Sequence, residues 1–310
     1  MWREGYVQGG DTRFFVRVLG TPGFAAGQPS DERDDELVVL LHGWPQDGTT
    51  WRYVAPVLAD AGYRVACPDL KGFGRTAAPK GTRYDPETLA DEISRLIRNL
   101  HARKAVLVGH DWGGAVAIAT AFRHPGLVRS LVVASVPTRR IDLRRAWHIP
   151  LLNVPVVPEI AFRLASRPLV AAGLRHAAAR PEAFTDEAVD TYADAVGAHP
   201  RGWLPYYRRL SRRAVVDATV RRVRQRAGFL PDPQPPNRLR VPAAVVWGEA
   251  DPVTPFGLAA GVAGDLDATL VGVPDAGHFV QEEAPLTVAE AILDLAGPGA
   301  HASTGPTPRR

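Results

Sequence analysis

The sequence predicts an α/β fold in which a mostly parallel central sheet is flanked by helices and a helical segment is inserted between two sheet-forming parts. Short β-rich runs alternate with helix-like segments, a pattern typical of parallel strands joined by crossover helices. One run, 37–41, is apolar at every position, as a strand covered on both faces should be. Between residues 137 and 236 this alternation stops, and helix-like stretches separated by prolines replace it.

Seven short runs predict the strands. They are rich in the apolar and β-branched side chains that strands favour. In chain order, the predicted strands are 14–19, 37–41, 63–66, 105–108, 128–134, 243–247 and 269–271.

Helix-like runs between these strands predict the helices. Apolar residues recur at helical spacing in 86–100, and the run at 112–123 stops at His124-Pro125-Gly126, which cannot continue a helix. The predicted helices outside the inserted segment are 51–61, 86–100, 112–123, 256–262 and 285–295. Helical stretches inside it include 160–165 and 187–196.

These elements divide the chain of 310 residues into a core in two parts with an insertion between them. Residues 1–136 and 237–297 are the predicted core, and residues 137–236 are a predicted helical cap. Four prolines between 231 and 236 close the cap, because proline cannot continue a helix. Residues 298–310 are predicted to be a disordered tail.

Composition excludes several classes of protein. With 45% apolar and 23% charged residues, the chain is far from the composition of disordered proteins. A single cysteine, Cys67, excludes an internal disulfide framework and a cysteine zinc site. The chain starts without a signal-peptide pattern and contains no run of about 18 apolar residues. We therefore expect a soluble, cytoplasmic protein without an integral membrane segment.

The predicted cap is basic, since residues 139–226 contain 17 Arg, no Lys and 8 acidic residues. Such a region could attract anionic substrates, lipid headgroups or nucleic acid. The arginines are spread along helix-like stretches with apolar partners, and the whole chain has 34 Arg against 3 Lys. We therefore interpret them as solvated helix faces and expect no nucleic-acid partner. The sequence leaves the oligomeric state open, a homodimer included.

The segment 105–114 carries the strongest chemical signal. An apolar strand runs into a helix through Gly109-His110-Asp111-Trp112-Gly113, with small residues two before and two after the central acid. This spacing indicates a nucleophile elbow, a strained turn that places the central side chain above the carboxyl edge of the sheet. A carboxylate there can displace a leaving group from saturated carbon and form an alkyl ester. The competing interpretation of Asp111 is a helix N-cap.

A second loop, His42-Gly43-Trp44-Pro45, follows the apolar strand 37–41. In such folds this loop supplies one backbone N–H to an oxyanion hole, and the residue after the nucleophile supplies another. The expected donors are therefore the amides of Trp44 and Trp112. Taken alone, the loop could equally be an aromatic plug with a turn proline.

An acid and a histidine follow the elbow in the chain order nucleophile, acid, histidine. Asp251 follows the strand 243–247, and His278 follows the last predicted strand. A histidine oriented by a carboxylate can activate water near neutral pH, so we expect His278 to be the base and Asp251 its partner. Glu249 and Asp275 compete for the role of the acid, and a lone loop histidine is often simply solvated.

Together these motifs resemble those of the α/β-hydrolase-fold epoxide hydrolases, over essentially the whole chain except the tail. Residues 42–45 are similar to the family's H-G-x-P motif, which usually has a cis proline, here Pro45. Residues 109–114 resemble its aspartate elbow, and residues 69–74 resemble its D-x-R-G-x-G turn, with Lys71 in place of arginine. The resemblance implies an α/β-hydrolase fold with a helical cap.

The resemblance also implies two cap residues that bind and protonate the epoxide oxygen. Epoxide hydrolases usually place two tyrosines there. Pro205-Tyr206-Tyr207-Arg208 resembles the later site and implies Tyr207, whereas the earlier site has His148 where tyrosine is usual. Some bacterial relatives use such a His/Tyr pair, and an imidazole N–H donates the same hydrogen bond. A histidine donor with an ordinary pKa would titrate at about pH 6–7.

The reaction that the resemblance implies has two steps and needs no metal or organic cofactor. Asp111 opens the epoxide to give a hydroxyalkyl ester, and a water molecule activated by His278 hydrolyses this ester to a vicinal diol. The implied partners are a small-molecule epoxide and water.

Two alternatives use the same features. A haloalkane dehalogenase shares the Asp111 elbow followed by Trp112, but Trp44 stands where such enzymes often have asparagine. Trp147 would then have to supply a second N–H to the halide. A non-catalytic, ligand-binding member of the fold would keep the pocket, yet it would not need a water-activating base.

Overall fold

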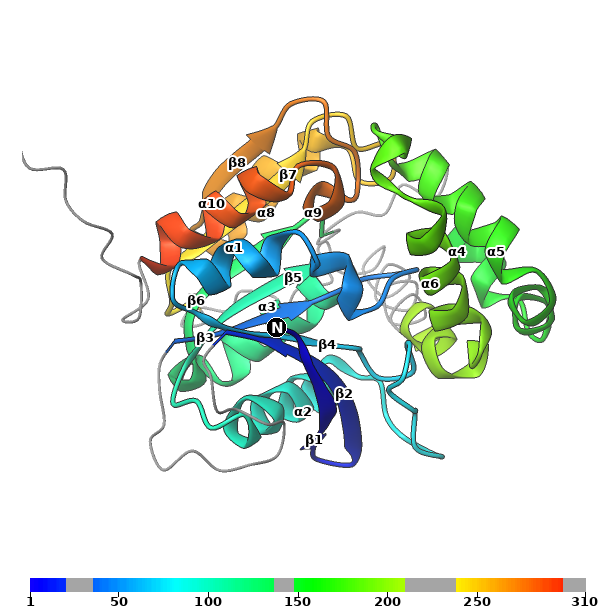
Figure 1. Ribbon diagram of the computed structural model, residues 1–310, viewed down its shortest axis with the longest axis horizontal. Helices are drawn as coiled ribbons and strands as arrows, with labels where there is room; N and C mark the ends of the chain where they lie inside the picture. Colours follow the sequence, from blue (N-terminus) through cyan, green and yellow to red (C-terminus); the bar gives the residue numbers. More distant parts are fainter. Residues whose placement is uncertain (21–35, 137–147, 210–237, 298–310) are drawn as a thin grey trace, which may run out of the picture.

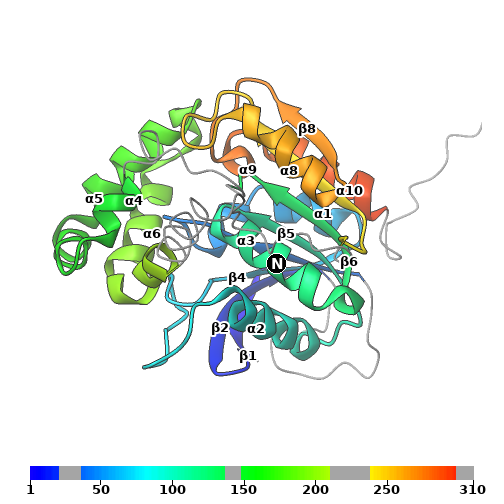
Figure 2. The same ribbon diagram turned by 180° about the vertical axis from the view of Figure 1, so that it is seen from behind.

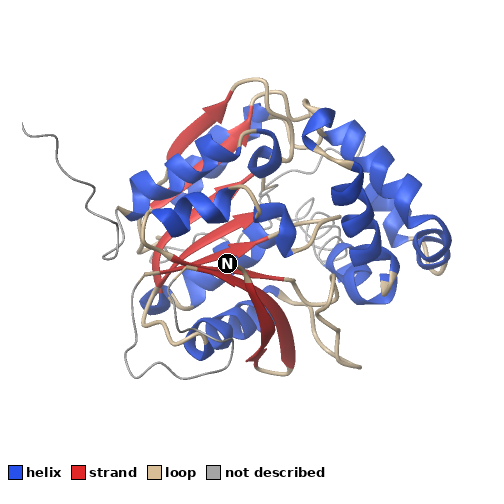
Figure 3. Ribbon diagram, viewed as in Figure 1, coloured by secondary structure: helices blue, strands red, loops and turns tan. Residues whose placement is uncertain are grey.

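The computed structural model describes residues 1–20, 36–136, 148–209 and 238–297. An eight-stranded sheet runs through the molecule, and the helices of the insertion between β6 and β7 lie to one side of it (Figures 1 and 3). The strands are β1 (Arg3–Gly9), β2 (Thr12–Leu19), β3 (Leu37–Leu41), β4 (Arg64–Pro68), β5 (Ala105–His110), β6 (Val128–Ala134), β7 (Ala243–Gly248) and β8 (Thr269–Val273).

The sheet is mostly parallel, as the sequence predicts. Its strand order is β1-β2-β4-β3-β5-β6-β7-β8. The pairs β1–β2 and β2–β4 are antiparallel, and all pairs from β4 to β8 are parallel. The carboxyl ends of these six parallel strands, β3 to β8, therefore share one edge of the sheet, where ligand sites of such folds form.

Both faces of the sheet are buried, and β3 shows why its sequence is apolar throughout. Successive side chains of a strand point to opposite faces. Leu37, Val39 and Leu41 lie in one core cluster, and Val38 and Leu40 lie in the other.

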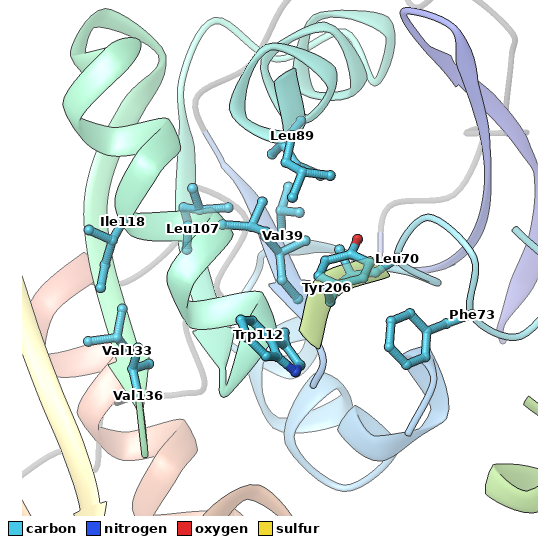
Figure 4. Close-up of a cluster of buried hydrophobic side chains, with 14 of the residues drawn as sticks. Val39, Leu70, Phe73, Leu89, Leu107, Trp112, Ile118, Val133, Val136 and Tyr206 are labelled. Atoms are coloured by element: carbon cyan, nitrogen blue, oxygen red, sulfur yellow. The ribbon is translucent and has the colours of Figure 1, made fainter. Parts of the chain in front are cut away.

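Helices cover each face. Helices α1 (Val54–Asp60) and α10 (Pro285–Ala296) pack against one face. Helices α2 (Pro86–Asn99), α3 (Trp112–Arg123) and α8 (Ala259–Leu266) pack against the other (Figure 2). Figure 4 shows part of this second cluster, including Val39 and Leu107 of adjacent strands, Leu89 of α2 and Ile118 of α3.

The insertion between β6 and β7 is helical wherever it is described as regular structure. It contains α4 (His148–Asn153), α5 (Val157–Ala177), α6 (Asp186–Gly197) and a further helix over residues 200–209. The predicted stretches 160–165 and 187–196 lie within α5 and α6. Helix α5 is broken at Ala165, with φ −142° and ψ 37°, three residues before Pro168, whose ring cannot accommodate a regular helix turn in front of it.

The predicted cap boundaries at 137 and 236, the proline cluster and the tail 298–310 lie outside the described residues. Within the described ranges, no helix combines the length and the apolar character needed to cross a membrane.

Two elements are missing from the prediction, and two helix starts differ from it. The short helix α9 (Val280–Glu283) has no counterpart among the predicted helices. The edge strand β1 could not be recognised in the sequence, because it is polar and largely exposed, with only Val7 and Gly9 buried. The predicted helix 51–61 is a 3₁₀ turn (Gly48–Trp51) followed by α1, and the predicted helix 256–262 likewise begins with a 3₁₀ turn (Phe256–Leu258). Short 3₁₀ segments are common at such helix starts.

Lys71, which replaces the arginine of the resembled turn, forms a buried ion pair. Its Nζ atom lies 2.6 Å from Oε1 of Glu92 on α2, and it also donates to the Thr82 hydroxyl at 2.9 Å. Lys71 is fully buried and Glu92 is 3% exposed. Removing one partner of such a pair leaves an uncompensated buried charge.

We predict that Lys71→Met lowers the free energy of unfolding by about 3–5 kcal/mol, as breaking one side of a buried pair does. Urea denaturation of the folded variant measures this. The double variant Lys71→Met/Glu92→Leu is the control and should lose clearly less, since it removes both charges. Equal losses in the two variants would show that the pair is not what stabilises this turn.

Candidate active site

Asp111 occupies the turn between β5 and α3, the predicted elbow. Its φ of 49° and ψ of −120° are strained for a residue with a side chain. The backbone is so tightly packed here that a Cβ added to Gly113 would lie 2.5 Å from the carbonyl oxygen of His42. Asp111 stands at the N-cap position of α3, but its side chain makes no capping hydrogen bond. A role as an ordinary helix cap therefore does not explain the strain.

The Asp111 carboxylate lies against the loop after β3. One oxygen accepts a hydrogen bond from the Trp44 backbone N–H at 3.0 Å. The backbone N–H of Trp112 also donates to the carboxylate. A Cβ added to Gly43 would lie 2.5 Å from the Asp111 Cβ, so this approach requires glycine. Burial raises the pKa of Asp111, while the charge of His278 and the two N–H groups oppose that rise. Both amides expected in an oxyanion hole thus meet at this carboxylate.

His278 and Asp251 are hydrogen-bonded. Nδ1 of His278 lies 2.9 Å from Oδ2 of Asp251, and the same oxygen accepts from the Thr254 hydroxyl at 2.6 Å. Oδ1 accepts from the backbone N–H groups of Val253 and Thr254, both at 2.8 Å. A carboxylate only accepts, so Nδ1 carries the proton of the neutral imidazole and Nε2 keeps its lone pair. His278 lines the same cavity as Asp111.

The structure separates Asp251 from the two competing acids. Glu249 and Asp275 are exposed and do not line the cavity. Asp251 is buried at 4% exposure and bonds to His278. The geometry therefore favours Asp251, at the end of β7, as the partner of the histidine.

The two histidines of the cavity have opposite pKa shifts. Burial is the largest influence on His278 and lowers its pKa, but the negative charges of Asp251, Asp111 and Glu283 together raise that pKa above its usual value. Burial lowers the pKa of His148 to about 4, and the charge of His278 acts in the same direction. His148 is therefore an uncharged imidazole at neutral pH, and the expectation that it titrates near pH 6–7 is wrong.

Tyr207 and His148 line the cavity from the insertion, opposite the elbow. Tyr207 lies in the helix 200–209 and His148 begins α4. The Tyr207 ring meets Trp112 edge to face at a centroid distance of 5.0 Å, and the His148 ring stacks on Trp44 with an interplanar angle of 7°. Burial and the Asp111 charge raise the pKa of Tyr207 well above its usual value, so the phenol stays protonated.

The neighbouring Tyr206 lies outside the cavity. Its ring contacts Tyr84 and Phe73 at centroid distances of 5.2 and 5.5 Å, within the cluster of Figure 4. Its buried hydroxyl has no hydrogen-bond partner among the described residues. Of this tyrosine pair, only Tyr207 can therefore meet a ligand beside Asp111.

The cavity has a volume of about 350 Å³ and is mostly apolar. Its lining includes the two indoles of Trp44 and Trp112 and many aliphatic side chains of α4 and α5. No Lys or Arg is present among the described lining residues. Besides the two indoles, the polar side chains that line the cavity are Asp111, His148, His176, Tyr207, Thr254 and His278.

His42 shapes the loop that carries Trp44. Its Nε2 atom accepts a hydrogen bond from the Leu70 backbone N–H at 2.8 Å, so Nδ1 donates to the Gly43 carbonyl at 2.9 Å. Burial lowers the pKa of His42 to about 4, which keeps this ring uncharged. The Trp44–Pro45 peptide is cis, as the resemblance implies.

Three buried side chains that are not among the predicted site residues also support the site. Thr254 bonds to Asp251, His110 lies 2.9 Å from the His278 carbonyl oxygen through Nε2, and Glu283 accepts from backbone N–H groups beside His278. Only Thr254 has a sequence signal, since a hydroxyl three residues after an acid can bond to its carboxylate.

Trp147, on which the dehalogenase alternative depends, lies outside the described residues. Within the part of the chain that the structure describes, no three His, Cys, Asp or Glu side chains converge as a metal site requires.

Known proteins with similar sequences share this architecture. Residues 36–285 match the α/β hydrolase fold family. The chain is 30% identical over 278 residues to the AB hydrolase superfamily protein YfhM of Bacillus subtilis (strain 168), a match that covers 84% of this chain and 90% of that protein. It is 29% identical over 286 residues to Epoxide hydrolase 3 of Xenopus tropicalis, covering 86% of this chain and 72% of that protein.

A solved structure has a similar fold. Epoxide Hydrolase A from Mycobacterium thermoresistibile superposes with a TM-score of 0.72 at 26% identity, over 96% of this chain and 99% of that chain. With the parallel sheet and the strained elbow, these matches identify the chain as a member of the α/β hydrolase fold family, with epoxide hydrolases among its relatives.

Proposed function

We propose that this protein is an epoxide hydrolase, which opens an epoxide to a vicinal diol through an ester on Asp111. The observation that carries the proposal is the meeting of an elbow carboxylate with two uncharged donors, Tyr207 and His148, in one apolar cavity. The similarity to proteins named epoxide hydrolases supports it. The same cavity contains His278, which is bonded to Asp251 as a water-activating base should be.

In the first step a carboxylate oxygen of Asp111 attacks one epoxide carbon, and the carbon–oxygen bond of the ring breaks. The departing oxygen accepts hydrogen bonds from Tyr207 and His148 and takes the Tyr207 proton. Tyr207 can supply it because its raised pKa keeps the phenol protonated. His148, with a pKa of about 4, stabilises the oxygen as a neutral N–H donor.

In the second step His278 removes a proton from a water molecule that attacks the Asp111 carboxyl carbon. The amides of Trp44 and Trp112 bind the negative oxygen of the tetrahedral intermediate. The ester bond breaks, and the leaving oxygen of the diol takes the proton from His278. The proton left on the regenerated carboxyl returns to Tyr207, so that every group is restored.

Ester formation changes the electrostatic surroundings of His278, the base of the second step. The charge of Asp111 is one of the influences that raise the pKa of His278. When the carboxylate becomes an ester, the negative charge leaves Asp111 and passes to the Tyr207 oxygen, which has given up its proton. Asp111 then no longer raises the pKa of His278, which suits a step that needs an uncharged base.

The cavity lining favours uncharged epoxides with alkyl or aryl substituents. Each buried methylene contributes about 0.8 kcal/mol, and no cationic side chain of the described lining could pair with a substrate carboxylate. The entrance is apolar as well, because Leu151 and Val157 line the cavity and are 55% and 62% exposed.

Haloalkane dehalogenation is the second candidate: although Trp44 stands where such enzymes often have asparagine, its indole provides an N–H of its own. Trp44 lines the cavity, and its buried indole nitrogen has no hydrogen-bond partner among the described residues. A halide leaving group needs such N–H donors. Both reactions form an ester on Asp111, so the mass of that ester distinguishes them.

We predict that a His278→Gln variant accumulates an ester with a neutral alkyl epoxide. Without the base the ester forms but does not hydrolyse, and intact-mass spectrometry should show a gain equal to the whole epoxide mass. The control is His278→Gln/Asp111→Ala, which should show no gain. A gain equal to a haloalkane minus hydrogen halide, with no epoxide adduct, would instead make the protein a dehalogenase.

We predict that Tyr207→Phe slows ester formation at least tenfold, equivalent to about 1.4 kcal/mol of lost transition-state stabilisation. Single-turnover measurements with an epoxide test this. Tyr206→Phe is the matched control: it should leave the rate unchanged, because the Tyr206 hydroxyl lies outside the cavity. A slower rate in the Tyr206 variant alone would reverse the assignment.

We predict that Asp111→Asn lowers the pKa of His278, because it removes one of the charges that raise it. The asparagine mimics the uncharged ester. Titration of the imidazole by NMR in the wild type and in the variant measures the difference. An unchanged or higher pKa in the variant would contradict the proposed change in the base between the two steps.

A further inference from the structure

Glu283 is a buried carboxylate, and among the described residues all of its side-chain hydrogen bonds come from backbone N–H groups, around His278 and just after α5. It ends the short helix α9 (Val280–Glu283) and is 5% exposed. Oε2 accepts from the N–H of Gly277 at 2.9 Å, and Oε1 accepts from the N–H of Phe279 at 3.2 Å. Two residues of the insertion also donate to Oε2, Ala179 and Arg180, both at 2.8 Å.

The N–H of His278 itself donates to the Ala177 carbonyl of α5 at 2.9 Å. All three backbone N–H groups of residues 277–279 are therefore bound by Glu283 or by the insertion. The contact is close, since a Cβ added to Gly277 would lie 2.7 Å from that same carbonyl oxygen. Glu283 thus joins the segment that carries the base to the end of α5.

We propose that Glu283 is a positioning residue for the base: it fixes the backbone of His278 against the insertion and so serves the hydrolysis of the ester. This inference rests on the proposed function. The hydrogen bond to Asp251 orients the imidazole ring of His278. It does not hold the backbone of residues 277–279, which other groups must fix. Four N–H groups on one carboxylate supply that restraint, and bonds to a charged acceptor are stronger than neutral ones.

The groups that open the ring lie on other elements than the segment that Glu283 holds. Asp111 lies at the start of α3, His148 begins α4 and Tyr207 lies in the helix 200–209. These elements carry all the groups of the first step. Loss of the Glu283 carboxylate should therefore affect the second step selectively.

Glu282, the preceding residue, provides a matched control. It is equally buried at 4% exposure and also contacts the insertion, through the Tyr192 hydroxyl of α6. Its other partners are Arg52, at 2.7 Å, the Thr50 hydroxyl, at 3.1 Å, and the Gln46 side-chain amide, at 3.3 Å. Glu282 thus contacts the insertion, but its side chain does not bind the backbone N–H groups of residues 277–279.

The experiment measures the two half-reactions separately in Glu283→Gln and Glu282→Gln. In Glu283→Gln the new side-chain NH₂ group is a donor, so it cannot accept hydrogen bonds from the backbone N–H groups that one carboxylate oxygen bound. We expect ester formation within about twofold of wild type, ester hydrolysis at least tenfold slower, and ester accumulating in the steady state by intact mass. In Glu282→Gln the ratio of the two rates should stay as in wild type.

Two results would overturn the inference: an unchanged hydrolysis rate in folded Glu283→Gln, or a loss shared equally by both steps or by both variants. If Glu283→Gln does not fold, Glu283→Asp keeps the charge, shortens its reach and should show the same selective slowing. If His278→Gln forms no ester with any epoxide, the proposed function is refuted instead. The rates of ester formation and ester hydrolysis in the Glu283 and Glu282 variants would then be measured with a haloalkane that does form the ester.

Discussion

The site depends on one constraint, the strained backbone that holds a buried carboxylate at the edge of the sheet. The positive φ of Asp111 costs on the order of 1–3 kcal/mol, which the surrounding structure must supply. Close packing around Gly43 and Gly113 maintains it. Parallel strands bring the other loops to the same edge, so that Trp44 after β3, Asp251 after β7 and His278 after β8 surround the carboxylate.

Burial then sets the charge of each group in the cavity. It raises the pKa of Asp111 and Tyr207 and lowers that of His148. Both donors from the insertion are consequently neutral, and each retains a proton to donate. His278 is the exception, because nearby carboxylates outweigh its burial. An uncharged pair of donors facing a carboxylate suits a reaction in which negative charge moves from Asp111 to the epoxide oxygen.

Much of the core and the order of Asp111, Asp251 and His278 could be predicted from local patterns, because buried strands and strained turns restrict their own sequences. The edge strand β1 could not, since it is polar and largely exposed. The protonation of His148 depends on burial by distant elements, which no local pattern records. Glu283 was missed for a related reason: two of its partners are backbone N–H groups about 100 residues earlier in the chain.

The break in α5 at Ala165 divides this helix into two parts. The first part carries Val157 at the cavity entrance, and the second ends at Ala177, whose carbonyl binds the His278 N–H. Both parts also line the cavity. This one helix therefore contributes to the entrance, to the wall of the cavity and to the hydrogen bond that holds the backbone of the base.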